Sequence, residues 1–442
     1  MSSRQAPRGT GHRFTAEPAE GDPIQDLLSA FSFSAYASSL TLARSLERKI
    51  TIYTGPPNSG KTHSAFQRLA AAPTGAYLAP LRLLAVEARD TLQGLGAPAN
   101  LKTGEDWEIV EGAQLTCSTI EMLAISRLLD VVVIDEAQQL FDPARGWAWT
   151  HAILAAPAHE LLIICAPHAL PAVRALLAVT GEPSAVEAFE RKGALRLLTA
   201  PLELGALEPG DAVVSFSRQD VLVTRDAILR ATGRPVAVVY GALPSEVRRR
   251  EAERFASGAA PVLSATDAIG QGLNLPIRRV LFTSLFKFDG AAVAPVPPAE
   301  VHQIAGRAGR FGFHEVGYVG VLRMGMCDEG HALAELAAAL RRAPAAPPHF
   351  RPSIGLAGWH VARIAERMGL TSLADCVDVW ANKLALAEES PFTRACVGAR
   401  AHSSANSARH AQTRAHTCKQ RASRARPLPH PHPLFSLPLR SG

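Results

Sequence analysis

Short apolar blocks of strand length alternate with helix-like segments from about Lys49 to Arg323. KITIYTG, for example, is followed by KTHSAFQRLAAA, and GAYLAP is followed by LRLLAVEARDTLQGL. Apolar runs of this length, separated by helices, are typical of parallel strands that helices cover on both faces. The chain is therefore predicted to have an α/β fold built on parallel sheets.

A stretch rich in Gly, Pro and acidic residues, LELGALEPGD at 202–211, interrupts this alternation, which then restarts. The break predicts two α/β domains in tandem. After Met326 the patterns become helical and predict a small helical C-terminal region. The expected parts are an N-terminal extension, two α/β domains, the helical region and a tail, at residues 1–48, 49–205, 206–325, 326–390 and 391–442.

The composition favours a soluble protein in a reducing compartment. Apolar residues make up 47% of the chain, but no apolar run approaches the roughly 20 residues that cross a bilayer, so we expect no membrane partner. The six cysteines form no Cys-x-x-Cys pair, which argues against a zinc site or a disulfide framework.

The first residues, MSSRQAPRGTGHRF, contain arginines but no apolar core, unlike a secretory signal. A mitochondrial presequence is an alternative, although Glu17, Glu20 and Asp22 come early for such a peptide. The expected location is the cytoplasm, with the mitochondrial matrix as the alternative.

The segment GPPNSGKT matches the pattern G-x-x-x-x-G-K-[ST] and lies between a predicted strand and a predicted helix. Its backbone N–H groups and the helix N-terminus would hold the phosphates of ATP. Lys61 would reach the β- and γ-phosphates, and the Thr62 hydroxyl would ligate Mg²⁺. The alternative is a Gly/Pro loop that only turns the chain. The expected nucleotide contacts here are Gly55, Pro56, Pro57, Asn58, Ser59, Gly60, Lys61 and Thr62.

Two carboxylates, Asp135 and Glu136, follow the apolar run VVVI, and Asp135 comes 74 residues after Lys61. In P-loop nucleotidases a carboxylate after an apolar strand serves the metal side of the site. We expect Asp135 to hold Mg²⁺ through its water shell, Glu136 to orient or deprotonate the attacking water, and Gln138 to sense the nucleotide. Taken alone, the pair could be only the solvated end of a strand.

The residues after this pair predict a helix. Asp142 and Pro143 fit the N-cap and N1 positions of a helix start. Trp147 and Trp149 are then packing residues on that helix.

The segment HQIAGRAGR near residue 306 carries Gln303, Arg307 and Arg310 at spacings of four and three. On a helix these side chains share one face, which suits a polyphosphate. A solvated face with salt bridges is the alternative. The loop SATDAIGQGLNLP can approach a nucleotide closely, and from it we expect Gly272 and Asn274 to contact ATP. Arg307 and Arg310 would complete the site from the second domain and stabilise charge on the γ-phosphate.

The order of these motifs resembles that of helicase superfamily two over roughly residues 50–323. The matching elements are GPPNSGKT, APLRLLAVE, TGE at 103–105, STIEM, DEAQ, VVSFSRQD, VLSATDAIGQGLNLP and QIAGRAGR. Within that superfamily PNSGKT, APLRLLA, LKTGE and RGWAWT resemble the DExH-type RNA helicases of the mitochondrial degradosome and their bacterial relatives.

This resemblance implies two tandem RecA-like domains that use ATP and Mg²⁺ to unwind nucleic acid, mainly RNA, with 3′-to-5′ polarity and beside a ribonuclease. It implies phosphate-backbone contacts at Arg82, Thr103, Thr119 and Thr266. DNA is not excluded as a substrate, since only 2′-hydroxyl contacts would discriminate. Two other functions stay open: an adaptor whose ATPase gates binding, and an ATPase that remodels protein or moves on duplex DNA.

The sequence also departs from the family. The Ser-Ala-Thr coupling motif after the DExx box is not recognisable, and ICAPHAL, at 164–170, stands about where it would be. The helical C-terminal region is shorter than in the mitochondrial relatives.

The tail from residue 391 has nine Lys and Arg residues and no acidic residue, so the net charge of +6 leaves −3 for the rest of the chain. This composition predicts a disordered basic tail. It is either an arm that holds RNA or, as we prefer, a product of out-of-frame translation after a frameshift near codon 390. In the second case the coding DNA contains a continuing open reading frame in another phase. A coding sequence without such a frame would exclude the frameshift.

Overall fold

The computed structural model describes most of the chain between residues 31 and 384. The described residues are 24, 27, 31–270, 275–288, 290–309, 314–325, 328–347, 350–356, 358–384 and 393–394. The expectation for the tail at 391–442 therefore lies outside the described residues, apart from β18 (Thr393–Arg394), which pairs with β17 (Ser353–Ile354).

The first domain is built on an eight-stranded sheet with the strand order β4-β3-β5-β2-β6-β7-β1-β8. All neighbouring strands are parallel except β3 and β4. The strands are β1 (Lys49–Thr54), β2 (Gly75–Ala79), β3 (Ala99–Lys102), β4 (Trp107–Glu108), β5 (Leu115–Thr119), β6 (Leu129–Ile134), β7 (Ala158–Cys165) and β8 (Ser184–Ala188). The helices are α4 (Lys61–Ala70), α5 (Arg82–Gly94), α6 (Gly146–Ala155) and α7 (Leu170–Val179).

Alternate residues of the central strand β6 face two separate cores. Val132 and Ile134 belong to one cluster of buried apolar side chains, and Val131 and Val133 belong to another. A period of two is the geometry of a strand, and burial on both faces explains why all four residues are apolar.

The second domain has a six-stranded, fully parallel sheet with the strand order β11-β12-β10-β13-β16-β9. Its strands are β9 (Ala194–Leu197), β10 (Asp211–Val214), β11 (Val236–Val239), β12 (Val262–Ala265), β13 (Arg279–Phe282) and β16 (Val316–Val321). Its helices are α8 (Arg218–Thr232), α9 (Ser245–Ala256), α10 (Pro298–Ala305) and α11 (Glu329–Arg341), and β14 (Phe286–Phe288) and β15 (Val293–Pro295) form an antiparallel hairpin.

Local signals set the ends of α8. The Ser217 hydroxyl accepts a hydrogen bond from the Asp220 amide at 3.0 Å and caps the start of the helix. Gly233, with φ +66°, ends it in the left-handed conformation that glycine adopts readily.

The prediction of two tandem α/β domains on parallel sheets is confirmed. No helix of the described part combines the length and the apolar character needed to span a membrane.

The change of sheet comes earlier than the expected domain boundary at residues 205 and 206. The strand β9 pairs with β16 of the second sheet, so the chain leaves the first sheet between Ala188 and Ala194. None of the four β9 residues is buried: the order along the strand is exposed, intermediate, exposed, exposed. An edge strand of this kind has little hydrophobic signal, whereas the Gly/Pro-rich stretch at 202–211 is only the loop before β10.

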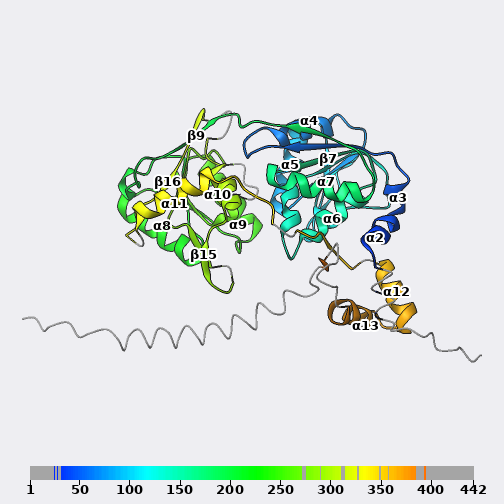
Figure 1. Cartoon of the computed structure of the whole chain (residues 1–442). Coiled ribbons are helices and arrows are strands. Elements are labelled where there is room, and N and C mark those ends of the chain that lie inside the picture. Colours follow the sequence, from blue (N-terminus) through cyan, green and yellow to red (C-terminus); the bar gives the residue numbers. More distant parts are fainter. Residues whose placement is uncertain are drawn as a thin grey trace, which may run out of the picture. The chain divides into compact units, whose positions relative to one another are not determined.

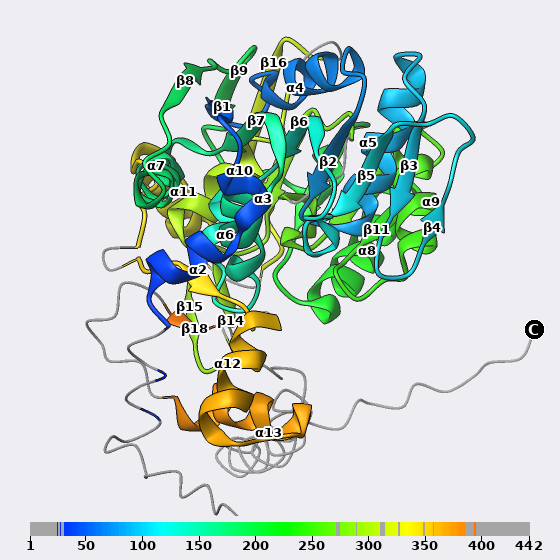
Figure 2. The ribbon, with the colours of Figure 1, turned by 90° about the vertical axis from the view of Figure 1, so that its right-hand side faces the viewer.

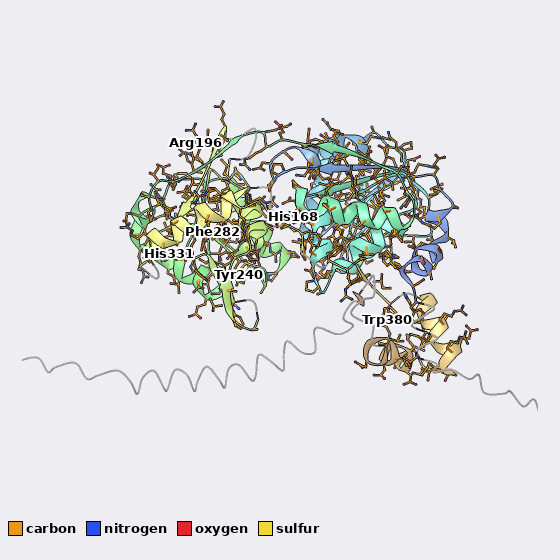
Figure 3. All side chains as sticks on the ribbon, viewed as in Figure 1. His168, Arg196, Tyr240, Phe282, His331 and Trp380 are labelled. Atoms are coloured by element: carbon orange, nitrogen blue, oxygen red, sulfur yellow. The ribbon has the colours of Figure 1, made fainter. Side chains whose placement is uncertain are left out.

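The expected helical C-terminal region is divided between the two domains. Ala332 and Leu336 of α11 lie in the core of the second domain, together with Phe282 (Figure 3). The helices α12 (Gly358–Met368) and α13 (Leu373–Asp378) instead pack on the first domain, since Ile364 and Cys376 belong to its core. Helical periodicity predicts each apolar face but does not identify the element that covers it.

The N-terminal extension also contributes to the core of the first domain. The helix α2 (Phe33–Ser39) lies beside α12 in Figures 1 and 2, and the short α3 (Thr41–Arg44) follows it. Phe31 makes an edge contact with Trp380, with ring centroids 5.9 Å apart, and Tyr36 is almost fully buried. Trp380 lies among the C-terminal helices (Figure 3). The two ends of the described chain thus share one apolar cluster.

The helix α6 begins later than the sequence predicts. Its first residue is Gly146, and the Asp142 carboxylate accepts hydrogen bonds from the amides of Ala144 and Arg145, each at 2.8 Å. Asp142 therefore caps a turn that precedes the helix, because its side chain is already satisfied within three residues.

A buried ion pair joins the first residues of β10 and β13. Asp211 is fully buried, and Arg279 donates to its two carboxylate oxygens at 2.6 and 2.5 Å. Arg279 also donates to the Ala206 carbonyl at 3.0 Å. Each charge of the pair therefore depends on the other.

Arg279→Ala is expected to destabilise the second domain by about 3–5 kcal/mol, because it leaves the buried Asp211 carboxylate without a cation and with the Glu208 amide as its remaining donor. The neighbouring Arg278 offers a matched control, since its ion pair with Glu208 is largely exposed. Arg278→Ala should cost less than about 1 kcal/mol. Thermal unfolding of both variants measures the difference, and equal losses would contradict a special role for the buried pair.

Candidate active site

The phosphate loop joins the end of β1 to the start of α4, as the motif predicts. Close packing requires glycine at Gly55, where a Cβ atom would lie 2.3 Å from the carbonyl oxygen of Phe189. Gly60, directly before α4, has φ +91°, a conformation that L side chains rarely adopt. The loop therefore depends on glycine at two positions.

The Lys61 ammonium points back into this loop. It donates to the carbonyl oxygens of Gly55 and Pro56 at 2.6 and 2.7 Å and to the Ser59 hydroxyl at 3.2 Å. Burial lowers its pKa, while the charges of Glu136 and Asp135 act in the opposite direction. A desolvated ammonium held by neutral oxygens is well suited to an anionic ligand.

Asp135 and Glu136 follow β6 at the sheet edge where β1 also ends, because both strands run parallel to β7 between them. Asp135 is only 4% exposed, and its carboxylate accepts from the Tyr77 hydroxyl and from the Glu136 amide, the latter at 2.7 Å. The Trp149 indole donates to the Asp135 carbonyl at 2.9 Å. The tryptophan expected only to pack thus also fixes the backbone of the carboxylate pair.

Glu136 has an unusual backbone conformation and an unusual pKa. Its φ of +53° is left-handed, which is rare for a residue other than glycine and is common at functional sites. Burial and the neighbouring Asp135 charge raise the pKa of Glu136 to about 7. The charges of Lys61 and Arg307 lower the pKa of both carboxyl groups, against the effect of burial.

Gln138 connects Glu136 to the end of β7. Its amide nitrogen donates to the Glu136 carboxylate, and its amide oxygen accepts from the Ala166 amide at 3.0 Å. Ala166 belongs to ICAPHAL, the segment that stands in place of a recognisable Ser-Ala-Thr motif. A backbone amide makes this contact, so no residue type in the sequence could have indicated it.

Gln303 and Arg307 approach from the second domain. The Gln303 amide nitrogen lies 3.4 Å from the Glu136 carboxylate, and the Arg307 guanidinium donates to the Gly270 carbonyl, with its Nε at 3.2 Å. Gln303 lies on α10, but that helix ends at Ala305, so the expectation of one helical face that includes Arg307 is wrong.

Close packing requires glycine on both sides of Arg307. A Cβ atom at Gly306 would lie 2.7 Å from the Pro57 ring, and Gly309 has φ +67° and lies directly against Gly317. Arg307 therefore sits in a turn, not in the helix. The other expected site residues of this domain, Arg310, Gly272 and Asn274, lie outside the described residues.

The four expected nucleic-acid contacts lie at or just after the carboxyl ends of strands. Arg82, just after β2, forms ion pairs with Glu105 and Asp106. The Thr103 hydroxyl, after β3, accepts from the Asp106 amide at 2.9 Å. Thr119 ends β5 and is half-buried. Thr266, after β12, accepts from the Ala268 amide at 3.3 Å.

The two residues expected to hold the metal, Thr62 and Asp135, both offer side-chain oxygen atoms as ligands. Thr62 contributes a hydroxyl at the start of α4, and Asp135 has a buried carboxylate whose two bonded oxygens retain further acceptor capacity. Mg²⁺ prefers oxygen donors and is commonly held by one or two protein groups together with substrate phosphates. The two residues therefore fit Mg²⁺. Within the described residues no group of three His, Cys, Asp or Glu side chains could hold a metal ion.

The fold and these contacts define a tandem P-loop protein of the helicase class. Residues 37–189 match the DEXQ-box helicase domain of Suv3, and residues 196–312 match the helicase conserved C-terminal domain. The chain therefore carries a Suv3-type DEXQ-box helicase domain followed by a helicase conserved C-terminal domain, as its motifs predict.

Several curated relatives are similar to this chain in sequence. The rice protein named ATP-dependent RNA helicase SUV3L, mitochondrial, is 41% identical over 293 residues, which cover 65% of this chain and 40% of that protein. The human ATP-dependent RNA helicase SUPV3L1, mitochondrial, is 41% identical over 283 residues, covering 61% of this chain and 36% of the relative. This chain thus spans roughly two fifths of the length of these relatives.

A solved structure supports the fold. Yeast Dbp5, in a complex with Gle1 and IP6, aligns with a TM-score of 0.50 at 18% identity, covering 74% of this chain and 93% of that one. At this identity the likeness shows the arrangement of elements alone.

Glu136→Gln is expected to make the protein unfold at a higher temperature above pH 7. Because the pKa of Glu136 is about 7 in the folded chain and 4.5 ordinarily, the carboxyl favours folding when protonated. That contribution is complete below about pH 4.5 and is lost as the pH rises through 7, at a total of about 3 kcal/mol. Glutamine stays neutral throughout.

Calorimetric unfolding temperatures between pH 4.5 and 8 check this prediction. The difference in unfolding temperature between Glu136→Gln and the wild type should increase as the pH rises. Glu111→Gln, at an exposed turn, is the matched control and should show no such trend. A constant gap would contradict a raised pKa at Glu136.

Proposed function

We propose that this chain is the motor core of an ATP-dependent RNA helicase, which hydrolyses ATP between two RecA-like domains to move along RNA and unwind it. The observation that carries the proposal is the meeting of two domains at one carboxylate. Glu136 of the first domain lies next to Lys61 and Asp135, and Gln303 of the second domain reaches it at 3.4 Å. Arg307 of the second domain lies close enough to influence its pKa.

In this proposal the phosphate-loop amides and Lys61 bind the β- and γ-phosphates of ATP. Thr62 and Asp135 would hold Mg²⁺, which supplies positive charge on the phosphate oxygens. Glu136, in its ionised form, accepts a proton from water while the water oxygen bonds to the γ-phosphorus. The bond from that phosphorus to the bridging oxygen breaks and ADP leaves. Arg307, and Arg310 in the same role, stabilise the charge that develops on the γ-phosphoryl group.

Gln138 and Gln303 would orient the Glu136 carboxylate. Because Gln138 also bonds the Ala166 amide, a change at Glu136 passes to the segment after β7. This contact is our candidate for the coupling that the family assigns to its Ser-Ala-Thr motif. Gly272 and Asn274 remain proposed nucleotide contacts.

RNA would lie across the carboxyl ends of the strands, with its phosphates at Arg82, Thr103, Thr119 and Thr266. Arg82 is engaged by Glu105 and Asp106, so RNA must compete with these carboxylates. The names of the relatives support RNA as the substrate and favour the mitochondrial alternative over the cytoplasm. The 3′-to-5′ polarity and a ribonuclease partner are further parts of the proposal.

Lys61→Ala and Glu136→Gln are each expected to lower kcat for ATP hydrolysis at least about 100-fold, since each removes a group that acts on the reacting phosphoryl or water. Glu136→Gln should still bind ATP. For the wild type, kcat/KM should rise with pH and level off above about 7, because only the ionised Glu136 accepts a proton.

The decisive measurement compares RNA and DNA as activators and follows strand displacement on duplexes with 3′ or 5′ tails. RNA-stimulated hydrolysis with displacement from a 3′ tail is expected. Stimulation without displacement would favour the adaptor, and hydrolysis by Lys61→Ala at the wild-type rate would refute the site.

A further inference from the structure

The connector between the two sheets, residues 189–193, runs along the phosphate loop. The carbonyl of Phe189 lies against Gly55 so closely that a Cβ atom there would be 2.3 Å from its oxygen. The Lys192 amide donates to the Asn58 carbonyl at 3.1 Å. The connector therefore contacts the loop at its first residue and at its middle, although neither motif spacing nor residue pattern marks it as part of the site.

The side chain of Lys192 lies over Gly60. A Cβ atom at Gly60 would be 3.1 Å from both Cε and Nζ of Lys192, so the absence of a side chain at Gly60 makes room for this ammonium. Gly60 immediately precedes Lys61, whose own ammonium lies in the loop. Two ammonium groups thus border the same short stretch of backbone, which is a favourable arrangement for a polyphosphate.

Hydrogen bonds of Arg191 connect the phosphate loop with the turn that contains Arg307. Its guanidinium donates to the carbonyl oxygens of Gly306, at 2.9 Å, and of Ala308. The Asn58 side chain donates to the same two oxygens, at 2.8 and 3.4 Å. These carbonyls flank Arg307 on both sides, so the path of its backbone depends on Arg191 and Asn58.

Among the described residues, no carboxylate forms an ion pair with the Arg191 guanidinium. Its hydrogen-bond acceptors are the backbone carbonyls of Pro57, Gly193, Gly306 and Ala308. None of the ion pairs found among the described residues includes Arg191, and burial lowers its pKa. A guanidinium that donates to several backbone carbonyls at once fixes the positions of those carbonyls relative to one another, as a positioning residue does.

We propose that the connector is part of the nucleotide site, together with the phosphate loop and the turn at residues 306–308. Lys192 binds the β- or γ-phosphate of ATP, and Arg191 positions Arg307. The proposal rests on the proposed function and names two residues that the family motifs do not include. Lys192 touches the substrate, whereas Arg191 acts only through the turn at residues 306–308. The two roles predict different kinetic effects.

The first experiment measures binding of ATP, ADP and AMP to the full chain by calorimetry with Mg²⁺ present. Lys192→Ala is expected to weaken ATP binding about 10- to 100-fold, as loss of a charge-assisted hydrogen bond would. AMP binding should stay unchanged, because AMP lacks the β- and γ-phosphates. Lys192→Arg should retain most of the affinity for ATP, since it restores a cation.

Lys49→Ala is the matched control, because Lys49 starts β1 at the end opposite the phosphate loop and its side chain is 76% exposed. It should bind ATP as the wild type does. Normal ATP binding by Lys192→Ala, with weakened binding by Lys61→Ala, would overturn the connector proposal alone. If neither variant lost affinity, the nucleotide site of the proposed function would itself be wrong. Equal loss of AMP and ATP by Lys192→Ala would indicate a distorted loop and would also overturn the assignment.

The second experiment is a double-mutant cycle on kcat between Arg191→Gln and Arg307→Ala. Arg191→Gln is expected to lower kcat about 10- to 100-fold, which is the scale of a displaced catalytic group, with little change in ATP affinity. In the Arg307→Ala background it should cause no further loss, because its effect passes through Arg307. Arg191→Lys should restore little of the lost kcat, since a single ammonium cannot bridge two carbonyls as the planar guanidinium does.

Thermal unfolding separates this role from a purely structural one. The unfolding temperature of Arg191→Gln should stay close to that of the wild type. Multiplicative losses in the double variant, or an equal loss of ATP affinity and kcat, would overturn the positioning role of Arg191.

Discussion

The burial of two adjacent carboxylates is the constraint on which the site depends. Asp135 and Glu136 lie at the carboxyl end of a strand covered on both faces, where an ionised carboxylate is costly unless donors and cations surround it. Tyr77, the Glu136 amide and Gln138 donate hydrogen bonds to these carboxylates, and Lys61 supplies positive charge. The compensation is incomplete, since the pKa of Glu136 remains near 7, and that residue is therefore poised to exchange a proton.

The second domain completes the charge balance at this position. Gln303 and Arg307 approach the same carboxylate, and the carbonyls beside Arg307 are held by Asn58 and Arg191 of the first domain and the connector. The contacts at the junction are mostly between side-chain donors and backbone oxygens. Because hydrogen bonds weaken steeply with distance and misalignment, these contacts tie the position of the phosphate loop to that of the turn at 306–308.

The frame around the site uses both ends of the described chain. Phe31 and Tyr36 share an apolar cluster with Trp380, and Ile354 beside α6 belongs to the same cluster. The carboxylate pair is fixed from this side through Trp149, which is fully buried in that cluster. The apolar core therefore extends to the site, and the helices at the two ends pack against the sheet that carries the carboxylate pair.

The sequence by itself determined the strand pattern, the phosphate loop and the carboxylates after VVVI, because these are local or periodic features. It misjudged the end of α10, the start of α6 and the grouping of the C-terminal helices, which depend on neighbours distant in sequence. Only the tertiary structure decided that Gln138 bonds Ala166 and that Arg191 bonds the carbonyls beside Arg307. Backbone amides and carbonyls are the same in every residue, so their partners leave no signature in a sequence.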